Sequence, residues 1–262
     1  MIPSVLSIAG SDSCGGAGIQ ADLKTITAFG LYGQTAITAL TAQNTFGVQG
    51  VFPVDPEFVT RQIDSVFADM RPDAVKIGMV SSPEVVNAIA DALAAQGDLQ
   101  VVVDPVMVAT TGASLAQGGA AAAMVERLFP LADVVTPNLS EAQVLSGIEV
   151  ETKEDMVRSA EAIAQLTPGA VLLKGGHLPG TADDLLRMPD DTCHWFFSPR
   201  VDTPNTHGTG CTLSSAIACG LACGLAVPEA VRQAKDYVYG AILHNPEMGK
   251  GTTGPLNHMW RI

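Results

Sequence analysis

Short apolar runs alternate with longer amphipathic segments along the whole chain. Runs rich in Val, Ile and Leu have the length of buried strands at residues 5–9, 74–77, 101–103, 134–135 and 171–173. One segment between them places its apolar residues on a single helical face, at Val59, Ile63, Val66, Phe67 and Met70. Another does so at Ile19, Leu23, Ile26 and Phe29, and Gly30 follows where that helix should end.

This alternation predicts βαβ units, and therefore an α/β fold in which helices cover both faces of a mostly parallel central sheet, a three-layer αβα sandwich. Residues 183–199 alternate more weakly and predict a hairpin or edge strands. Residues 210–225 and 228–243 predict two closing helices. Because no linker, repeat or low-complexity tract interrupts the pattern, we expect a single domain over residues 1–262.

The charge balance excludes some classes of partner. Fourteen basic and 27 acidic residues give a net charge of −13, which repels nucleic acid and anionic lipid. The five cysteines form no C-x-x-C pair, as is typical of a protein from a reducing compartment. No apolar run reaches the length of a membrane span, and the first residues lack the features of a signal peptide. We therefore expect a soluble cytoplasmic protein.

Polar residues follow the predicted strands at their carboxyl ends, where parallel sheets collect ligands. Residues 10–18 form a glycine-rich loop after the first strand, and Asp104 follows the strand at 101–103. Asn138 and Glu141 follow the next strand, and Lys174 follows the strand after that. Two carboxylates, a lysine and flexible glycines are thus predicted at one rim of the sheet.

The most informative segment is residues 205–212, directly before a helix of small residues. Gly208 and Gly210 allow the backbone to turn its amides toward an anion, and the helix N-terminus adds partial positive charge. This pattern predicts a phosphate cradle, although the chain has no Walker sequence. Cys211 lies in the first helical turn, where the helix dipole favours a thiolate, and it is our candidate general base.

Asp104 and Glu141 are the candidate ligands of a divalent cation, directly or through water, because phosphoryl transfer depends on charge neutralisation. Lys174 is expected to contact the nucleotide phosphates from the adjacent strand end. Asn138 and Glu141 also have the spacing of a capping box, so a purely structural role for this pair is an equal alternative.

A second glycine pattern favours a different class of enzyme. Gly16-x-Gly18-x-x-Ala21 matches a dinucleotide-binding fingerprint, which would indicate an oxidoreductase. No Asp or Glu occurs between Asp22 and Asp55, so the acid expected to bind the ribose is missing. The oxidoreductase interpretation is therefore a remote alternative.

Taken together, these segments resemble the hydroxymethylpyrimidine and hydroxymethylpyrimidine phosphate kinases of thiamine biosynthesis, within the ribokinase-like superfamily. The resemblance covers essentially the whole chain and is carried by residues 9–12, 15–25, 41–45, 76–79, 104–107, 136–139, 174–177 and 206–212. It implies an αβα sandwich, usually dimeric, that uses ATP and magnesium to phosphorylate the pyrimidine's hydroxymethyl group and then the resulting monophosphate.

The resemblance also implies roles for individual residues. Gln43 should hydrogen-bond the aminopyrimidine edge, since a side-chain amide both donates and accepts. The expected lining of the substrate pocket is Gly10, Ala17, Met79 and Val106. The expected nucleotide contacts are Lys174, Asn138, Thr206 and Thr209, and Cys211 should lie near the alcohol.

Two alternatives remain open within this fold. Pyridoxine kinases share the glycine-rich start and the Gly-x-Gly-Cys segment, whereas residues 43–45 and 76–79 favour the pyrimidine enzyme. A non-catalytic ligand-binding member of the fold is the other. The chain also departs from the family pattern: Cys14 replaces a serine, and Thr110 and Thr111 replace a lysine and a serine that would favour phosphate binding.

Overall fold

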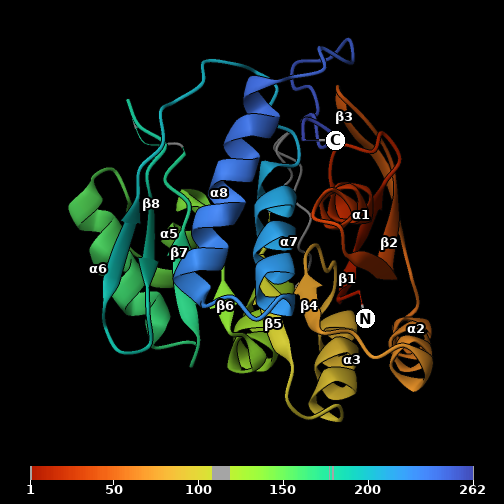
Figure 1. The fold of residues 1–262 in the computed structure, drawn as a ribbon. Coiled ribbons are helices and arrows are strands. Elements are labelled where there is room, and N and C mark those ends of the chain that lie inside the picture. The colour runs from red at the N-terminus through yellow and green to blue at the C-terminus, as the bar shows by residue number, and fades with distance from the viewer. Residues whose placement is uncertain (1, 108–118, 177, 179, 262) are drawn as a thin grey trace.

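The described part of the chain forms one continuous nine-stranded sheet with helices packed on both faces (Figure 1). The structure, a computed structural model, describes residues 2–107, 119–176, 178 and 180–261. The strands are β1 (Ser4–Asp12), β2 (Tyr32–Asn44), β3 (Gly47–Pro53), β4 (Ala74–Ile77), β5 (Gln100–Val103), β6 (Val134–Val135), β7 (Ala170–Leu173), β8 (Asp184–Arg187) and β9 (Cys193–Phe196). The α-helices are α1 (Gly18–Ala28), α2 (Pro56–Asp69), α3 (Pro83–Ala94), α4 (Ala120–Ala123), α5 (Leu139–Ser146), α6 (Lys153–Ala164), α7 (Thr209–Ala222) and α8 (Val227–Leu243).

The order of the strands is β3-β2-β1-β4-β5-β6-β7-β8-β9. The six central strands, β2, β1, β4, β5, β6 and β7, are parallel, whereas β3 pairs antiparallel with β2, and β8 pairs antiparallel with both β7 and β9. The chain moves from β1 outward to β2 and then returns to β4 on the other side of β1. Such a change of direction opens a crevice at the carboxyl ends of the strands, where ligands bind in folds of this type.

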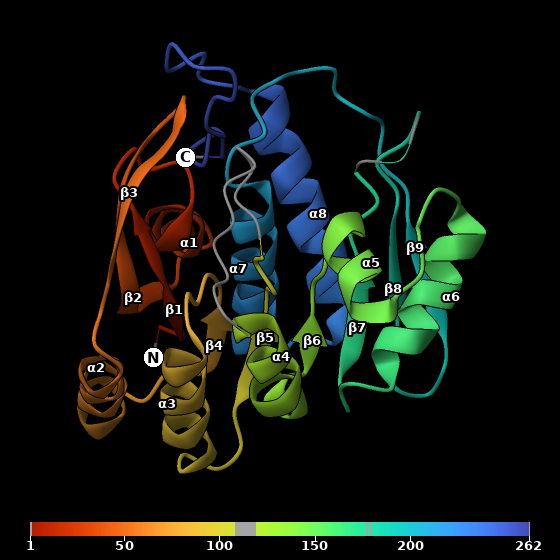
Figure 2. The same cartoon turned by 180° about the vertical axis from the view of Figure 1, so that it is seen from behind.

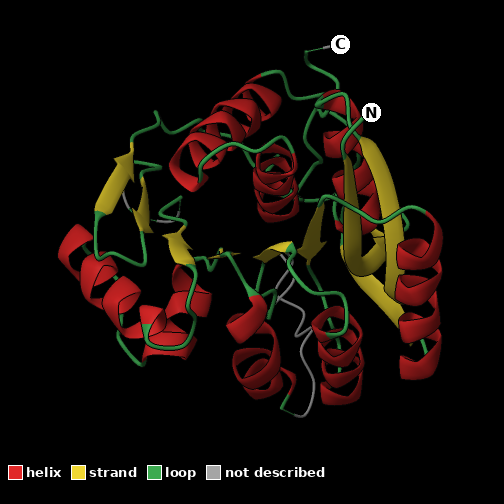
Figure 3. Cartoon of the chain, turned by 60° about the horizontal axis from the view of Figure 1, so that its bottom comes forward, coloured by secondary structure: helices red, strands yellow, loops and turns green. Residues whose placement is uncertain are grey.

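Alternate strand residues form separate hydrophobic cores on the two faces of the sheet. Val102 packs under α7 and α8, while its neighbours Val101 and Val103 face α2, α3, α5 and α6. Figure 2 shows these four helices, with α4, on one face, and Figure 3 shows the three layers from below. Strands buried on both faces read as continuous apolar runs, as the sequence shows here.

The structure confirms the αβα sandwich and each predicted strand and helix. The predicted hairpin at residues 183–199 is β8 and β9. Helix α7 ends at Ala222, three residues before the predicted end, because Gly224 takes a left-handed conformation (φ 79°). The sequence analysis did not identify β2 and β3, since the buried positions of β2 are small or polar, such as Ala36 and Thr38. Thr110, Thr111 and His177 lie outside the described residues.

Candidate active site

Helix α7 begins directly beside the glycine-rich loop that follows β1. Gly208 is its N-cap, with φ 89°, and a Cβ atom there would lie 1.8 Å from the Gly16 carbonyl oxygen. The N–H group of Thr212 donates to the Gly208 carbonyl at 2.9 Å. The N–H groups of Gly210 and Cys211 meet no acceptor in the described part of the chain. These two amides are therefore available to an anion at the helix N-terminus.

A lysine and two acids face this helix start. A Cβ atom on Gly210 would lie 3.3 Å from both the Asp104 Oδ2 and the Lys174 Nζ atoms. The Lys174 Nζ atom lies 2.8 Å from Asp104 Oδ1 and 3.9 Å from Glu141 Oε2. The structure thus brings the free amides of α7, the two acids and the lysine to one mouth. The two acids and the lysine follow the carboxyl ends of β5, β6 and β7, which are neighbours in the sheet.

Opposite charges decide the protonation of Asp104 and Lys174. Burial alone raises the pKa of Asp104, but the ammonium groups of Lys174 and Lys76 outweigh it and hold that pKa below its usual value. Burial alone lowers the pKa of Lys174, and the charges of Asp104 and Glu141 reverse this effect. Thr136 Oγ1 also donates to Asp104 Oδ1 at 3.1 Å. The pair is therefore ionised, and Lys174 carries a fixed positive charge.

Asn138 and Glu141 form the capping box that the sequence analysis kept as an alternative. The Glu141 N–H group donates to Asn138 Oδ1 at 2.9 Å, and the Asn138 N–H group donates to Glu141 Oε2 at 2.7 Å. Burial, together with the charge of Asp104, raises the pKa of Glu141 to about 7, against the opposing effect of Lys174. The capping role places the Glu141 carboxyl at the mouth, so the structural role does not exclude a functional one.

Cys211 is half-buried in the first turn of α7. Burial raises the pKa of its thiol to about 11, and the positive charge of Lys76 opposes this shift. Burial therefore opposes the contribution of the helix N-terminus, which favours a thiolate. Loss of hydration outweighs the favourable electrostatic contributions, and the resting group is a thiol.

A buried ion pair, which the sequence analysis did not identify, lies next to this turn. The Lys76 Nζ atom is 2.8 Å and 2.9 Å from the two carboxylate oxygens of Asp22, and both side chains are fully buried. Ser7 and Ser215 donate to the same carboxylate at 2.6 Å and 2.8 Å. Ser215 lies one helical turn after Cys211, so the pair packs against the face of α7 that carries the thiol. A lysine within the apolar run of β4 was the available signal, because a buried lysine requires a partner.

Four of the predicted substrate-pocket residues lie near the ends of β1, β2, β4 and β5, and the fifth, Ala17, is the N-cap of α1. A Cβ atom on Gly10 would lie 3.1 Å from the Met79 sulfur, so these two residues are in contact. Ala17 is next to Gly208, whose added Cβ atom would be 3.3 Å from the Ala17 Cα atom. Gln43 lies at a β-bulge between β2 and β3, and its Nε2 atom is 3.3 Å from His207 Nε2. Val106 is half-buried two residues after Asp104.

The two predicted threonine contacts form the turn before α7. The N–H group and Oγ1 atom of Thr209 both donate to the Thr206 carbonyl, at 3.2 Å and 3.1 Å. Both side chains are half-buried, and no described acid or lysine pairs with them. They therefore lie in the turn that leads into the nest, our name for the two free N–H groups of Gly210 and Cys211 at the start of α7.

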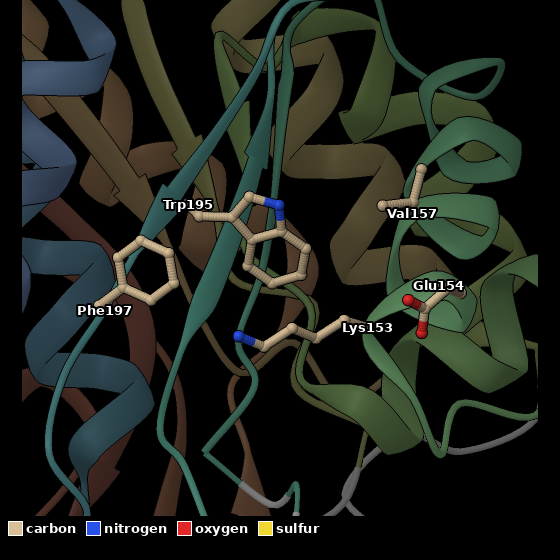
Figure 4. A pocket seen from close by; sticks show the side chains of 5 residues that line it. All are labelled: Lys153, Glu154, Val157, Trp195 and Phe197. Carbon is tan, nitrogen blue, oxygen red and sulfur yellow. The ribbon is translucent and has the colours of Figure 1, made fainter.

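A separate hollow lies at the far edge of the sheet. It is lined by Lys153, Glu154, Val157, Trp195 and Phe197 (Figure 4). The Lys153 ammonium lies 5.1 Å from the centre of each aromatic ring and 2.7 Å from Asp183 Oδ2. None of the predicted site residues lines this hollow, and its own lysine already pairs with the aromatic rings, which indicates a structural contact.

A helix start with two available amides, a charged lysine and two acids at the carboxyl edge of a parallel sheet are features expected of a small-molecule kinase, and the fold is ribokinase-like. Residues 12–257 match the family model described as phosphomethylpyrimidine kinase, and the chain belongs to this family. It is therefore a phosphotransferase. The chain is 52% identical to a hydroxymethylpyrimidine/phosphomethylpyrimidine kinase of Rhizobium meliloti, over all of this chain and 98% of that protein.

Solved structures agree with this assignment. The phosphomethylpyrimidine kinase of Clostridium difficile 630 matches with a TM-score of 0.82 and 45% identity, covering 92% of this chain and 99% of that one. An ADP complex of the Bacillus subtilis pyridoxal kinase matches with a TM-score of 0.90 and 38% identity, covering 98% of both chains. Kinases of two different substrates thus share this fold. The substrate must therefore be inferred from the side chains of the pocket and not from the fold. In the described residues no helix is long and apolar enough to cross a membrane.

Proposed function

We propose that this protein transfers the γ-phosphate of ATP to the hydroxymethyl group of 4-amino-5-hydroxymethyl-2-methylpyrimidine, and then phosphorylates the monophosphate to the diphosphate, in thiamine biosynthesis. One observation carries the proposal. The amides of Gly210 and Cys211 open onto the same mouth as Asp104, Lys174 and Glu141. A pure binding protein has no evident need for anion-binding amides and paired acids in one place.

The nest and Lys174 together would hold the phosphates. Two N–H groups at a helix start stabilise negative charge on the transferred group, and Gly208 is required for the close approach of the first loop. The Lys174 ammonium, now paired with Asp104, would exchange that partner for a phosphate oxygen. Asn138, Thr206 and Thr209 would contact the rest of the nucleotide from the rim.

The acids fit a hydrated magnesium ion. Lys174 engages Asp104 Oδ1, whereas among the described residues Asp104 Oδ2 has only a long contact of 3.4 Å with Ser214 Oγ. That oxygen and the Glu141 carboxyl would hold the ion through water, as is usual for magnesium, which gives up its water ligands reluctantly. When bound, the ion would neutralise charge on the phosphates, and ionisation of Glu141 would follow from the added positive charge.

Gln43, Gly10, Ala17, Met79 and Val106 would form the pyrimidine pocket. Gln43 supplies a donor and an acceptor side by side, which the amino group and ring nitrogen of the substrate require. Cys211 would accept the proton of the alcohol. Because its pKa is about 11 in the free protein, the fraction present as thiolate limits this step at neutral pH.

We infer that the protein acts in the cytoplasm as a homodimer. The free edge strand β3 and helix α2 expose a group of apolar side chains around a groove, with Leu40, Val51, Phe52 and Phe58 between 44% and 69% exposed. An exposed apolar group of this kind beside an unpaired strand is typical of an interface between protein molecules. A second copy of the chain is the partner that the family resemblance implies.

One assay tests the proposed function. The purified protein is given ATP and magnesium with the hydroxymethylpyrimidine, its monophosphate or pyridoxal, and ATP consumption is measured. We expect consumption with both pyrimidines. Consumption with pyridoxal alone would instead favour the second candidate, to which the similarity to the B. subtilis structure points. No consumption with any of the three would contradict a kinase function.

A further inference from the structure

Four polar side chains meet where the first loop, β2 and the start of α7 come together. His207 Nε2 lies 2.8 Å from Asp12 Oδ2, and Gln43 Nε2 lies 3.3 Å from the same histidine nitrogen. At the other end of the Gln43 amide, Oε1 lies 3.0 Å from Thr41 Oγ1. The hydrogens in this chain of contacts determine which way the Gln43 amide faces, because its oxygen and nitrogen have nearly the same shape.

Asp12 determines the tautomer of His207. Burial alone raises the pKa of Asp12, but hydrogen bonds from His207 and from loop N–H groups lower it below its usual value. An ionised carboxylate only accepts, so the proton of His207 must lie on Nε2. The other ring nitrogen, Nδ1, is buried and has no partner in the described part of the chain, and a proton there would be left unpaired.

Thr41 determines the other end of the network. Its hydroxyl has one hydrogen, and the Ser11 carbonyl oxygen, which can only accept, lies 2.9 Å away. The Thr41 oxygen is then left as an acceptor toward Gln43. If Gln43 Nε2 faces His207, an N–H donor of Gln43 meets the N–H donor of His207. At the other end, Gln43 Oε1 then faces the Thr41 oxygen, and no hydrogen lies between these two acceptors.

We propose that His207, held by Asp12, is a specificity-determining residue that keeps the Gln43 amide turned with its oxygen toward His207 and its nitrogen toward Thr41. In this orientation the single Nε2–H of His207 is shared between the Asp12 carboxylate at 2.8 Å and the Gln43 oxygen at 3.3 Å, and the Gln43 N–H donates to the Thr41 oxygen. The backbone of Gln43 is also fixed, since Ser13 Oγ contacts both its N–H group and its carbonyl at 2.8 Å. The orientation of the Gln43 amide is independent of the proposed function, and only the identity of the ligand that the amide recognises rests on it.

A fixed amide selects one hydrogen-bonding pattern in the ligand. The second lone pair of the oxygen accepts from an amino group on the His207 side, and the second N–H donates to a ring nitrogen on the Thr41 side. An analogue with an oxo group and a ring N–H in these places presents the opposite pattern. A freely turning glutamine would accept both compounds, whereas the His207 contact penalises the second. His207 would therefore exclude oxopyrimidines.

The tautomer can be measured without any substrate. In ¹⁵N-labelled protein at pH 7.5, the ring nitrogens of His207 are assigned by their loss in His207→Gln. We expect a protonated Nε2 and an unprotonated Nδ1. A proton on Nδ1 alone, which would leave Nε2 as an acceptor, would overturn the proposal. This result does not depend on kinase activity, so it remains decisive if the proposed function fails.

Kinetics test the consequence for recognition. Wild-type protein should prefer the aminopyrimidine over its oxo analogue by roughly 100-fold or more in kcat/KM. His207→Phe keeps a ring against Gly16 but removes the N–H group, and the preference should fall below about tenfold, mainly through KM. His207→Gln, whose amide N–H reaches the same acceptors, should retain it. An unchanged preference in His207→Phe, or an equal loss in both variants, would contradict the assignment.

Discussion

At the scale of single residues, the Cys211 thiol is the group whose chemistry depends most on its surroundings. Cys211→Ala should fold and lose about 10²- to 10⁴-fold of the turnover of the alcohol, the usual contribution of a general base. In the wild type this turnover should rise with pH between 6.5 and 9, because the thiolate fraction grows below a pKa of about 11. Steady-state rates across this range measure both effects.

The second phosphorylation and a neighbouring cysteine provide the controls. The monophosphate substrate is already largely ionised near neutrality, so its turnover should fall less in Cys211→Ala. Cys223→Ala, at the exposed end of the same helix, should behave as the wild type. A pH profile that is identical in wild type and Cys211→Ala would remove Cys211 as the base.

Glu141 links the site to stability. Its folded pKa of about 7 exceeds its ordinary value of 4.5, so the folded state favours the protonated carboxyl. Below pH 4.5, Glu141 therefore does not lower the free energy of unfolding. It lowers this free energy increasingly as the pH rises from 4.5 to 7, and the full loss is present above pH 7. Glu141→Gln keeps an acceptor for the Asn138 N–H group and removes that loss, on the order of 3 kcal/mol at pH 8.

Thermal unfolding without nucleotide or metal checks this linkage. Glu141→Gln should unfold at a higher temperature than wild type at pH 8, by ~2–4 °C for each kcal/mol in a chain of this size. The difference should shrink at pH 5. A difference of equal size at both values would show that the carboxyl is not raised in pKa. The same variant should lose kinase activity, because a neutral amide binds magnesium less well.

At the scale of elements, the two ends of α7 contain glycines in left-handed conformations with different surroundings. Gly208→Ala would place a Cβ atom 1.8 Å from the Gly16 carbonyl oxygen, so the nest must open. We expect a loss of roughly 1–2 kcal/mol from backbone strain and a further ~1–3 kcal/mol from overpacking, with activity abolished. Gly224→Ala meets nothing within 4 Å and should pay the strain alone.

Urea unfolding and ATP consumption of the two variants separate strain from packing. If Gly208→Ala were no less stable than Gly224→Ala and retained its activity, the close approach of the first loop to α7 would not matter for the site. A larger destabilisation of Gly208→Ala with loss of turnover is the expected outcome.

At the same scale, the sequence predicts those elements whose buried positions form a recognisable pattern of apolar residues. The apolar runs around Val102 and Leu172 lie in the buried centre of the sheet, and their carboxyl ends locate Asp104 and Lys174 by topology alone. Strand β2 shows no such pattern, because its inner face is built from Ala36, Thr38 and other small or polar residues. Strand β2 is therefore determined by its pairing with other strands, which the periodicity of the sequence does not reveal.

The same limit applies to the site. The glycines around Cys211 predict the nest, because their spacing is local. The raised pKa of the thiol follows from burial under distant elements, which the chain does not encode locally. The Asp22–Lys76 pair joins residues 54 positions apart, and the Asp12–His207 contact joins residues 195 apart. Such contacts become visible only when the fold brings distant segments of the chain together.

At the scale of the whole molecule, the continuous sheet from β3 to β9 supports our proposal that residues 1–262 form one domain. Both hydrophobic cores extend along this sheet, so the two halves should unfold together. Calorimetry should show one transition, and two separated transitions would contradict the proposal.

The proposed dimer belongs to the same scale. Phe52 is 69% exposed on edge strand β3, and Phe52→Asp should shift the protein from dimer to monomer in sedimentation equilibrium at micromolar concentrations. Phe197→Asp is a matched control, because Phe197 is 73% exposed at the opposite edge of the sheet. It should leave the dimer intact. A wild-type protein that is monomeric at tens of micromolar would contradict the interface.

The position of bound nucleotide tests the central claim most directly. In a crystal structure with a non-hydrolysable ATP analogue, magnesium and the hydroxymethylpyrimidine, the terminal phosphate should accept hydrogen bonds from the amides of Gly210 and Cys211, with Lys174 and Asp104 beside it. The pyrimidine should lie against Gln43, its alcohol pointing to that phosphate. Nucleotide bound elsewhere, with the start of α7 untouched, would contradict the account.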